Sequence, residues 1–558
     1  MRRDSPASPP SRRLPLAGVL KVGRPSDIWF KPASSVVVAV APPNLTLLAL
    51  GRLDLAMYTM AGSLCALYAH NRPYAARARV LAGVVLGMLG GLAVALVTAS
   101  FTTDAVVLVT VGALLAAVQK TLCDATRVGP PGHVVLTFIS SASLFAPQSL
   151  GQVPGHLAAA AVAGAWAWTV GMAPGLVRPH GPERRATAHA LGAAAAFAQA
   201  RGTGAEHAGA RAAGAAAVHV SWQALLSTGA RSAPRRALER LVVRAEVALA
   251  APADAEPERL RAWARDLRGG GPIPPADDPP ADDPPADDPD AGELLGVEAE
   301  LDVPARPLRT RLGPLAPFAL RTAVGCALAG YVSLALGIGR PYWALVTAAS
   351  LYQANVSLTW SRGVQRVVGN LIGVLVFAAV VPLAHLGQAS LVLCCLALTF
   401  GAEALIGRNY WLGSVCVTPM ALLITEFTHH QRTAELMADR VLDTLVGALV
   451  GFLAAVAVTN RRAGDRVEEA LDSVERARER AAGVLAARSP APGALESARR
   501  GLAAAVVELR ATADAAAGEW WQRALPPERV MMAEQAGHRT LAAVVRRRGR
   551  HFLEDAQA

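Results

Sequence analysis

A chain of 558 residues that is 53% hydrophobic, with a mean hydropathy of +0.33, is too apolar for an ordinary soluble protein and typical of a polytopic membrane protein. The net charge of +11 would also suit nucleic-acid binding, but no basic stripe interleaved with aromatic residues is present, which argues against that class. The six cysteines lie within or beside apolar segments and lack C-x-x-C spacing, so neither a disulfide framework nor a zinc site is expected.

The first 32 residues form a basic stretch. Seven Lys or Arg residues precede position 32, and no apolar core long enough for a secretory signal peptide is present. We therefore predict that residues 1–32 are a disordered cytoplasmic tail that leads into the first membrane helix.

Two blocks of closely spaced apolar segments follow, at residues 33–177 and 314–460. Because hydrocarbon offers backbone groups no hydrogen-bonding partner, segments of this length and hydropathy are best placed as membrane-spanning helices. Six segments are expected in each block, near 33–50, 55–70, 80–97, 105–121, 133–147 and 155–175, then near 317–337, 342–358, 364–384, 389–406, 410–427 and 438–458. The sequence thus predicts an all-α polytopic membrane protein with about twelve transmembrane helices.

The two blocks share short sequence patterns. Gly51-Arg52 and Gly339-Arg340 each precede a segment, and the spacing Gly83-x-x-x-Gly87 recurs as Gly369-x-x-x-Gly373. The offsets are nearly constant, at 286 to 288 residues. An even number of helices in each block makes this a parallel repeat of two six-helix halves. Chance similarity between two regions rich in Ala, Val, Leu and Gly is the alternative.

The distribution of Lys and Arg predicts the orientation. With the N-terminus inside, the cytoplasmic loops hold most of the basic residues near the membrane, and the outer loops hold few. The outer loops contain only Arg52, Arg340 and Arg432. We therefore predict a multi-pass protein of the inner (plasma) membrane with both termini in the cytoplasm.

Polar stretches separate the two blocks and follow the second. Residues 178–313 are predicted to form a cytoplasmic helical insert. An acidic tract near its end, at 272–290, contains Pro-Pro-Ala-Asp-Asp three times; it cannot bury a core and is predicted to be an extended linker. Residues 461–558 carry three amphipathic helices with short connections, which is typical of an antiparallel cytoplasmic bundle.

Enzyme signatures are absent from the sequence, which has no Walker A loop, nucleophile elbow or H-E-x-x-H motif, so we predict no enzyme and no cofactor or metal. Charged residues inside apolar segments are informative, because each costs roughly 2.5–3.5 kcal/mol to insert centrally. Glu403 and Asp443 are candidates for proton coupling. The alternatives are an interfacial carboxylate for Glu403 and, for Asp443, an ion pair with Arg440 one turn away.

Four further residues are candidates for contact with a substrate. Gln353 falls in the inner part of the eighth segment, and Asn370 lies between two glycines of the ninth, where it could also hold packed helices together. Arg362 and Arg366 stand four residues apart and share one helix face at the predicted cytoplasmic mouth. Such a pair favours a carboxylate, although the positive-inside rule also accounts for it without a ligand.

Four motifs occur in order in the second half: R-P-Y-W-A at 340–344, R-x-x-x-R-x-x-G-x-x-x-G at 362–373, R-N-Y-W at 408–411 and R-x-x-D-T-x-x-G at 440–447. Together they resemble the FUSC family, the fusaric acid resistance protein-like and aromatic acid exporter membrane proteins, over roughly 315–460. Asn370 departs from the family pattern, where a small hydroxyl residue is usual.

The resemblance implies a permease that exports organic anions, with aromatic carboxylic acids favoured, by gradient-driven efflux. In this hypothesis the anion meets Arg362 and Arg366 and then passes Asn370, Gln353 and Tyr410 between the two halves. The alternatives are a passive organic-anion channel and a non-transporting scaffold that acts through its cytoplasmic helices. The expected partners are a small organic anion and the lipid bilayer, with a second copy of the chain or an envelope protein also considered, and no nucleic acid.

Overall fold

The computed structural model describes residues 14, 16–23, 29–200, 205–227, 232–275, 312–427, 432–458, 463–487, 491, 493–517 and 527–555. Within these ranges every regular element is a helix, so the predicted all-α class is confirmed. Most of the predicted Pro-rich linker at 272–290 lies outside the described residues.

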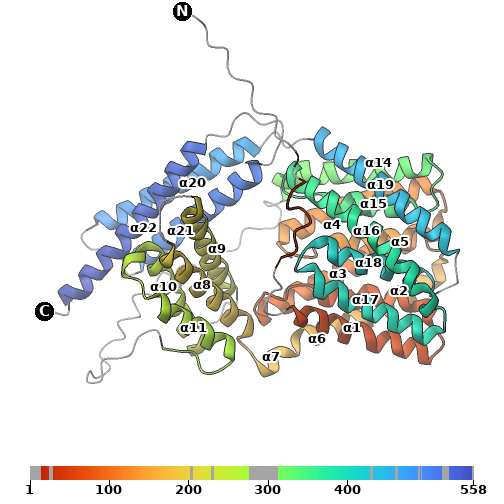
Figure 1. The fold of residues 1–558 in the computed structure, drawn as a ribbon, viewed down its shortest axis with the longest axis horizontal. Helices are drawn as coiled ribbons and strands as arrows, with labels where there is room; N and C mark the ends of the chain where they lie inside the picture. Colours follow the sequence, from red (N-terminus) through yellow and green to blue (C-terminus); the bar gives the residue numbers. More distant parts are fainter. Residues whose placement is uncertain are drawn as a thin grey trace, which may run out of the picture.

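Twelve apolar helices form the membrane domain, six in each half, and each corresponds to one predicted segment (Figure 1). The first half comprises α1 (Phe30–Ala49), α2 (Ala56–Ser63, extended by a 3-10 turn at Leu64–Leu67), α3 (Tyr74–Phe101), α4 (Ala105–Thr126), α5 (Val134–Leu144) and α6 (Val153–Met172). The second half comprises α14 (Ala316–Ala335), α15 (Pro341–Leu351), α16 (Val356–Ala384), α17 (Gln388–Ile406), α18 (Tyr410–Thr425) and α19 (Thr433–Ala457).

Eight of these helices are long and apolar enough to cross a bilayer. The other four are the second and fifth helices of each half, namely α2, α5, α15 and α18. The eleven residues of α15 extend about 16 Å at 1.5 Å per residue, roughly half of the ~30 Å hydrocarbon thickness. The predicted count of about twelve helices therefore holds for apolar helices, but four of them are too short to span alone.

The eighth predicted segment, 342–358, is wrong as a single helix. The structure ends α15 at Leu351 and begins α16 at Val356, because the Asn355 side chain accepts a hydrogen bond from the Leu358 amide at 2.8 Å. Such an N-cap satisfies an amide that lacks a partner in the first helical turn. Gln353 consequently lies in the connection between two helices and not inside one.

The same pairs of helices pack together in both halves. Within each half the second helix packs on the sixth and the third packs on the fifth, as α2 on α6 and α15 on α19, and α3 on α5 and α16 on α18. The two halves meet in the same way twice, through α1 with α17 and α14 with α4. The predicted parallel repeat is therefore present in the helix packing.

Glycines of the repeated spacing bring α16 and α18 into close contact. A Cβ atom at Gly369 would lie 2.6 Å from the Trp411 carbonyl oxygen, and one at Gly373 would lie 2.7 Å from the Thr418 Cβ. Contacts this short are possible only without a side chain, as is usual where membrane helices approach closely. These glycines set the distance between the helices that carry Arg366 and Tyr410.

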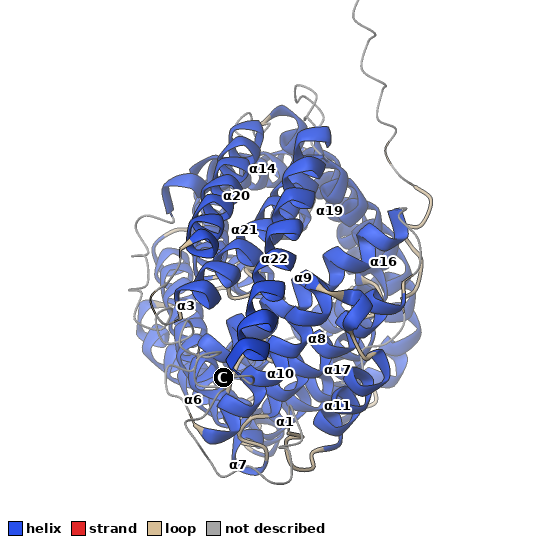
Figure 2. Cartoon of the chain, turned by 90° about the vertical axis from the view of Figure 1, so that its left-hand side faces the viewer, coloured by secondary structure: helices blue, strands red, loops and turns tan. Residues whose placement is uncertain are grey.

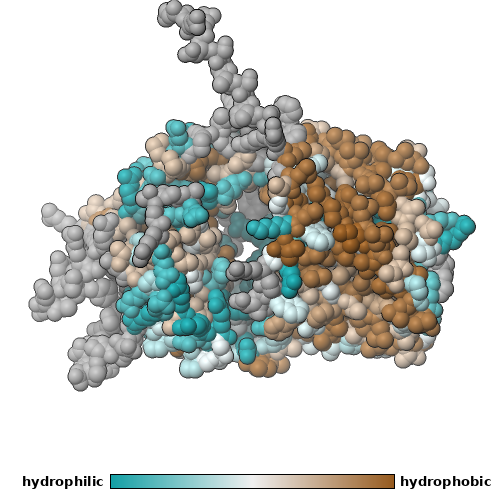
Figure 3. All heavy atoms as spheres, in the orientation of Figure 1, coloured by the Kyte–Doolittle hydropathy of each residue, from teal (hydrophilic) through white to brown (hydrophobic). Residues whose placement is uncertain are grey.

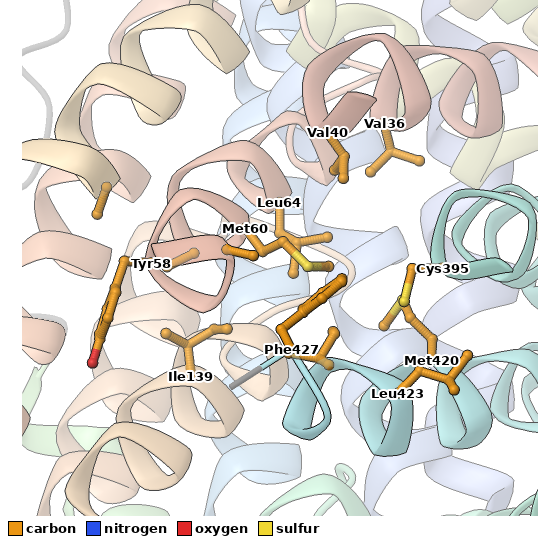
Figure 4. Close-up of a cluster of buried hydrophobic side chains, with 14 of the residues drawn as sticks. Val36, Val40, Tyr58, Met60, Leu64, Ile139, Cys395, Met420, Leu423 and Phe427 are labelled. Atoms are coloured by element: carbon orange, nitrogen blue, oxygen red, sulfur yellow. The ribbon is translucent and has the colours of Figure 1, made fainter. Parts of the chain in front are cut away.

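Buried apolar side chains from both halves form one cluster in the membrane domain (Figure 4). Met60 and Leu64 of α2 lie opposite Met420 and Leu423 of α18, with Phe427 among them. The cluster also receives side chains from α1, α5 and α17. Its apolar contacts join the two halves.

Among the described residues, seven polar helices form a second domain, which lies at one end of the membrane domain (Figures 1 and 2). We call it the polar domain. Its insert helices are α8 (Gly181–Gln199), α9 (Ala205–Leu226), α10 (Ala233–Ala250) and α11 (Pro257–Gly269), reached through the short α7 (Pro174–Val177). Its tail helices are α20 (Ala463–Ala486), α21 (Ala494–Ala517) and α22 (Pro527–Asp555).

The insert and tail helices each enclose an apolar core of their own and pack together through α9 with α21 and α10 with α22. Both therefore lie on the same side of the membrane domain, as an even number of helices between them requires. Hydrophobic residues dominate the surface of the membrane domain and hydrophilic residues that of the polar domain (Figure 3). This contrast is what a bilayer around one domain and water around the other would select.

Candidate functional site

A cavity of about 2760 Å³ lies between the two membrane halves. At one end it is lined by polar-domain residues such as Arg185 and Arg268, and at the other by Met420 of α18 and Arg440 of α19. Tyr342 also lines the cavity, and its ring lies 5.6 Å from that of Phe145 between centroids, which joins the two halves at this point. The cavity therefore extends from the polar domain into the membrane domain as far as these residues.

Positive charge dominates the cavity wall. Among the described residues that line it, fourteen are Lys or Arg and two are carboxylates, Asp124 and Glu403. Asp124 is already engaged, because Lys120 lies 3.0 Å from it. Low-dielectric walls focus the field of such an excess and attract anions. Apolar side chains, including Phe138, Met60 and Val346, line the same space.

Arg362, Arg366 and Tyr410 form the first polar cluster of the site, near the polar-domain end of α16. The Arg366 Nη1 atom donates a hydrogen bond to the Tyr410 hydroxyl at 2.9 Å. The Arg362 guanidinium lies over the same ring, with its central carbon 3.9 Å from the ring centroid. The three predicted residues are thus in direct contact, and all three line the cavity.

Arg440 forms the second cluster, deeper in the membrane domain. It is 2% exposed, lines the cavity and lies with its guanidinium carbon 5.1 Å from the Trp343 ring centroid. Its Nη2 atom donates to the Asn370 side-chain oxygen at 3.2 Å, and Thr418 donates to the same oxygen. Asn370 is not among the residues that line the cavity. Its contact with the site therefore runs through Arg440.

In the described chain Arg440 makes no ion-pair contact with a carboxylate. Across the described ranges no carboxylate lies within 4.0 Å of Arg362, Arg366 or Arg440, and the Nε and Nη1 atoms of Arg440 have no hydrogen-bond partner. A buried cation without a counter-charge is costly, and within membranes it usually marks a functional site. From the sequence, Arg440 was expected only to pair with Asp443. Its position in the fourth motif was the signal that could have identified it as a residue of the site.

The two carboxylate candidates lie in different surroundings. Asp443 is fully buried and accepts a hydrogen bond from Ser333 of α14 at 2.5 Å, instead of pairing with Arg440. It does not line the cavity. Glu403 of α17 does line the cavity, and in the described chain no cation lies within 4.0 Å of it. Of the two, only Glu403 can meet a solute in this conformation.

Gln353 also lines the cavity, in the connection between α15 and α16. Its backbone carbonyl accepts a hydrogen bond from Arg321 of α14 at 3.0 Å. Irregular backbone inside a membrane domain is tolerated where it borders a cavity or is buried in protein. The structure therefore brings Gln353, Arg362, Arg366, Glu403 and Tyr410 to one cavity.

Residues 16–23, which we call the N-terminal strap, lie along the α17–α18 connection. The Asn409 side chain donates to the backbone carbonyls of Val19 and Lys21, both at 3.0 Å, and Gln365 donates to the Val19 carbonyl at 2.9 Å. The Trp411 indole donates to the Leu20 carbonyl at 3.2 Å. The strap thus holds the start of α18, next to Tyr410.

The first half contributes basic residues to the cavity, among them Arg77 and Lys120, and it also contains a buried neutral network. Gln119 of α4 donates to Ser140 and accepts from Thr137, both on α5 and both at 2.9 Å. Arg77 lies 2.7 Å from a ring nitrogen of His70. In the described part of the chain no group of three His, Cys, Asp or Glu side chains is placed to hold a metal ion.

The fold and the site define a multi-pass α-helical membrane protein with a basic cavity between two parallel repeats. Residues 327–454, within the second half, match the family described as fusaric acid resistance protein-like, which confirms the predicted FUSC resemblance over this stretch. The chain is also 32% identical over 160 residues to a protein named "Uncharacterized membrane protein YvaC" from Bacillus subtilis (strain 168). That match covers 28% of this chain and 25% of the Bacillus protein. No solved structure matches the chain.

Proposed function

We propose that this protein is an inner-membrane permease that exports organic anions, with aromatic carboxylic acids as the favoured class. The observation that carries the proposal is the cavity wall, with fourteen basic and two acidic side chains and a buried Arg440 that lacks an acidic partner. Apolar surface beside guanidinium groups suits a ring that bears a carboxylate. The match to the fusaric acid resistance protein-like family supports a transporter.

In this proposal the polar domain and both termini lie in the cytoplasm. An anion enters the cavity from that side and first meets Arg362 and Arg366, which the Tyr410 ring holds in place. It then moves toward Arg440, which Asn370 orients. Export would follow when the apolar cluster and the Phe145–Tyr342 contact open at the far side and the inner mouth closes.

Proton coupling, if export uses it, is assigned to Glu403, because its carboxylate faces the same cavity as the arginines. Asp443 is the second candidate and would act through Ser333 and α14 instead of through contact with the solute. A proton on Glu403 would remove the negative charge that competes with the substrate anion. Replacing Glu403 by Gln should therefore leave anion binding intact and abolish the dependence of export on the proton gradient.

The test is efflux of labelled benzoate, 4-hydroxybenzoate and fusaric acid from cells that lack their own exporters. Wild-type protein is compared with the Arg362→Gln/Arg366→Gln variant and with Arg432→Gln, whose exposed arginine does not line the cavity. We expect efflux by the wild type and by Arg432→Gln, and little by the double variant at equal membrane level. Efflux that persists after the proton gradient is collapsed, with the membrane potential held, would favour the passive channel.

A further inference from the structure

A group of basic side chains lies at the edge of the large cavity, where the first membrane half meets the polar domain. It consists of Lys31 at the start of α1, Arg77 at the start of α3, Arg178 directly after α7 and Arg185 near the start of α8. All four side chains line the cavity. We call this group the junction cluster. Both domains contribute to it.

The charges of the junction cluster lie close enough to repel one another. Arg178 and Arg185 both act on Lys31, and Arg185 also acts on Arg77. Within the described ranges no carboxylate lies within 4.0 Å of any of the four. Glu183 attracts Arg185, but it is 4% exposed and does not line the cavity. An anion placed among the four cations would relieve their repulsion.

Tyr74, the first residue of α3, packs against the segments that carry two of these arginines. A Cβ atom at Gly175 of α7 would lie 3.0 Å from the Tyr74 ring, and one at Gly181 of α8 would lie 3.8 Å from the Tyr74 hydroxyl. The guanidinium carbon of Arg77 lies 6.0 Å from the centroid of the same ring. The packing of α3 against α7 and α8 therefore fixes where the charges of the cluster lie.

Arg77 is the buried member of the cluster, with 4% of its surface exposed. Its Nη2 atom lies 2.7 Å from Nδ1 of His70, in the connection before α3. Burial, together with the charges of Arg77 and Arg185, lowers the pKa of His70 to about 4, so the ring is neutral near pH 7. His70 therefore holds Arg77 in place without cancelling its charge. The Nε atom of Arg77 has no hydrogen-bond partner in the described chain.

Exposed apolar side chains border the junction cluster. Leu176 and Val177 of α7 are 90% and 82% exposed, the largest values for bulky hydrophobic side chains in the described chain, and Arg178 follows directly. Phe30, next to Lys31, is 47% exposed. The helices α1 and α3 begin at this end of the membrane domain and α6 ends there, next to α7 (Figure 1). The cluster therefore lies at the level of lipid headgroups, with apolar side chains beside it.

We propose that the junction cluster binds the phosphate of an anionic phospholipid, such as phosphatidylglycerol, with the acyl chains against α7. Guanidinium groups bind phosphate oxygens through paired hydrogen bonds, and basic pockets between membrane helices at this level suit anionic headgroups. A zwitterionic headgroup carries its own ammonium group, which the four cations would repel. The bound lipid would connect α1 and α3 of the first half to α8 of the polar domain. This site does not depend on what the cavity transports.

The first test measures lipid binding to the purified full-length chain in detergent by native mass spectrometry. The wild type should bind phosphatidylglycerol at least tenfold more tightly than phosphatidylcholine. Arg178→Gln/Arg185→Gln should weaken phosphatidylglycerol binding about tenfold or more, because hydrogen bonds from charged groups are lost. Arg79→Gln/Arg265→Gln removes the same charge from exposed positions that do not line the cavity. This control pair should bind as the wild type does.

A second variant distinguishes a lipid from a soluble phosphate without removing a charge. Leu176→Ser/Val177→Ser changes two exposed side chains, so its thermal unfolding should match that of the wild type. Its binding of phosphatidylglycerol should be several times weaker, because contacts with the acyl chains are lost. Millimolar sn-glycerol 3-phosphate, which has the phosphate but no acyl chain, should not displace phosphatidylglycerol from the wild type.

Three results would overturn the inference. The first is equal binding of phosphatidylglycerol and phosphatidylcholine by the wild type, and the second is equal loss in the two double-arginine variants. The third is displacement by glycerol 3-phosphate together with unchanged binding by Leu176→Ser/Val177→Ser, which would assign the cluster to a soluble phosphate ester.

Thermal unfolding gives an independent measurement of the same site. Phosphatidylglycerol should raise the unfolding temperature of the wild type by several degrees and that of Arg178→Gln/Arg185→Gln much less, because a ligand stabilises the folded state that binds it. Equal shifts in both proteins would refute the site. Failure of the transport proposal looks different, because efflux would be absent while selective lipid binding persists.

Discussion

The two membrane halves share one helix arrangement but differ in the side chains that face the space between them. When Gly83 is aligned with Gly369, the residues Arg362, Arg366 and Asn370 of α16 fall opposite Ala76, Val80 and Val84 of α3. The first half buries a neutral network around Gln119 and one arginine, Arg77, whereas the second buries Arg366 and Arg440, neither with a carboxylate within 4.0 Å in the described chain. The repeat therefore fixes the backbone, and the second half supplies the arginine cluster around Tyr410 and the deeper Arg440.

This comparison also explains where the family match lies. Residues 327–454 cover most of the second half and none of the first. The first half still packs by the same helix pairs. Helix packing depends on small residues and apolar surface, which many sequences provide, whereas an arginine site requires particular residues at particular positions.

The Arg362→Gln/Arg366→Gln variant tests the difference between the two halves most directly. We expect export of aromatic carboxylates to fall about a hundredfold, since each charged hydrogen bond is worth roughly 1.5–3 kcal/mol. The first-half counterpart, Val80→Ala, should change export less than twofold. Initial efflux rates at matched membrane levels decide this, and an equal loss in both proteins would show that the halves contribute alike.

Arg440→Met should separate activity from stability. Export should fall about tenfold or more, because the deep cationic contact is lost. The detergent-solubilised protein should nevertheless unfold at a higher temperature, because a buried charge without an acidic partner is replaced by an apolar side chain of similar length. Thermal unfolding and efflux are measured on the same variant. A lower unfolding temperature together with lost export would indicate a structural role only.

Glycines at equivalent positions should respond differently to alanine. Gly369→Ala places a Cβ 2.6 Å from the Trp411 carbonyl oxygen and should destabilise the protein by about 1–3 kcal/mol. A Cβ at Gly83 meets nothing within 4 Å, so Gly83→Ala should be neutral or slightly stabilising. The fraction of monodisperse protein after heating compares the two. Similar losses would mean that the halves pack with equal tightness at this position.

Asn409→Ala should have a small effect. It removes two hydrogen bonds to the N-terminal strap, and we expect faster proteolysis of the strap with a two- to threefold loss of export. Trp411→Phe, which removes one indole hydrogen bond and keeps a ring, should show the same change to a lesser degree. Unchanged proteolysis in Asn409→Ala would show that these bonds do not hold the strap.

Hydropathy and spacing were sufficient to predict the twelve apolar helices and their repeat. They were not sufficient to predict the interruption between Leu351 and Val356, because an average over apolar residues hides a four-residue connection that a single Asn cap stabilises. The predicted segment 55–70 likewise runs past α2, which ends at Ser63 and continues as a 3-10 turn to Leu67. The residues around a helix end do not indicate how far the helix extends across the bilayer.

The site was predictable where its residues share one helix, as Arg362 and Arg366 do. The role of Arg440 was not, because its partner Asn370 lies 70 residues away and its aromatic neighbour Trp343 lies on another helix. Pairing with Asp443 at three residues' distance was the nearest expectation, and Ser333 of α14 takes that place instead. Contacts between distant segments are set by the tertiary packing of α14, α16 and α19.

The contacts of the N-terminal strap determine which sequence changes this region should tolerate. Asn409, Gln365 and Trp411 bind only backbone carbonyls of the strap, and every amino acid supplies the same carbonyl. Substitutions at the exposed positions 20 and 21 should therefore be tolerated, whereas inserting or deleting one residue shifts each carbonyl by roughly 3.3–3.6 Å. Val19 is buried, Gly18 has a φ of +83°, and a Cβ at Gly23 would lie 3.0 Å from the Arg408 carbonyl oxygen, so these three positions should accept fewer residue types. Related chains should conserve the length of this segment more strictly than its composition.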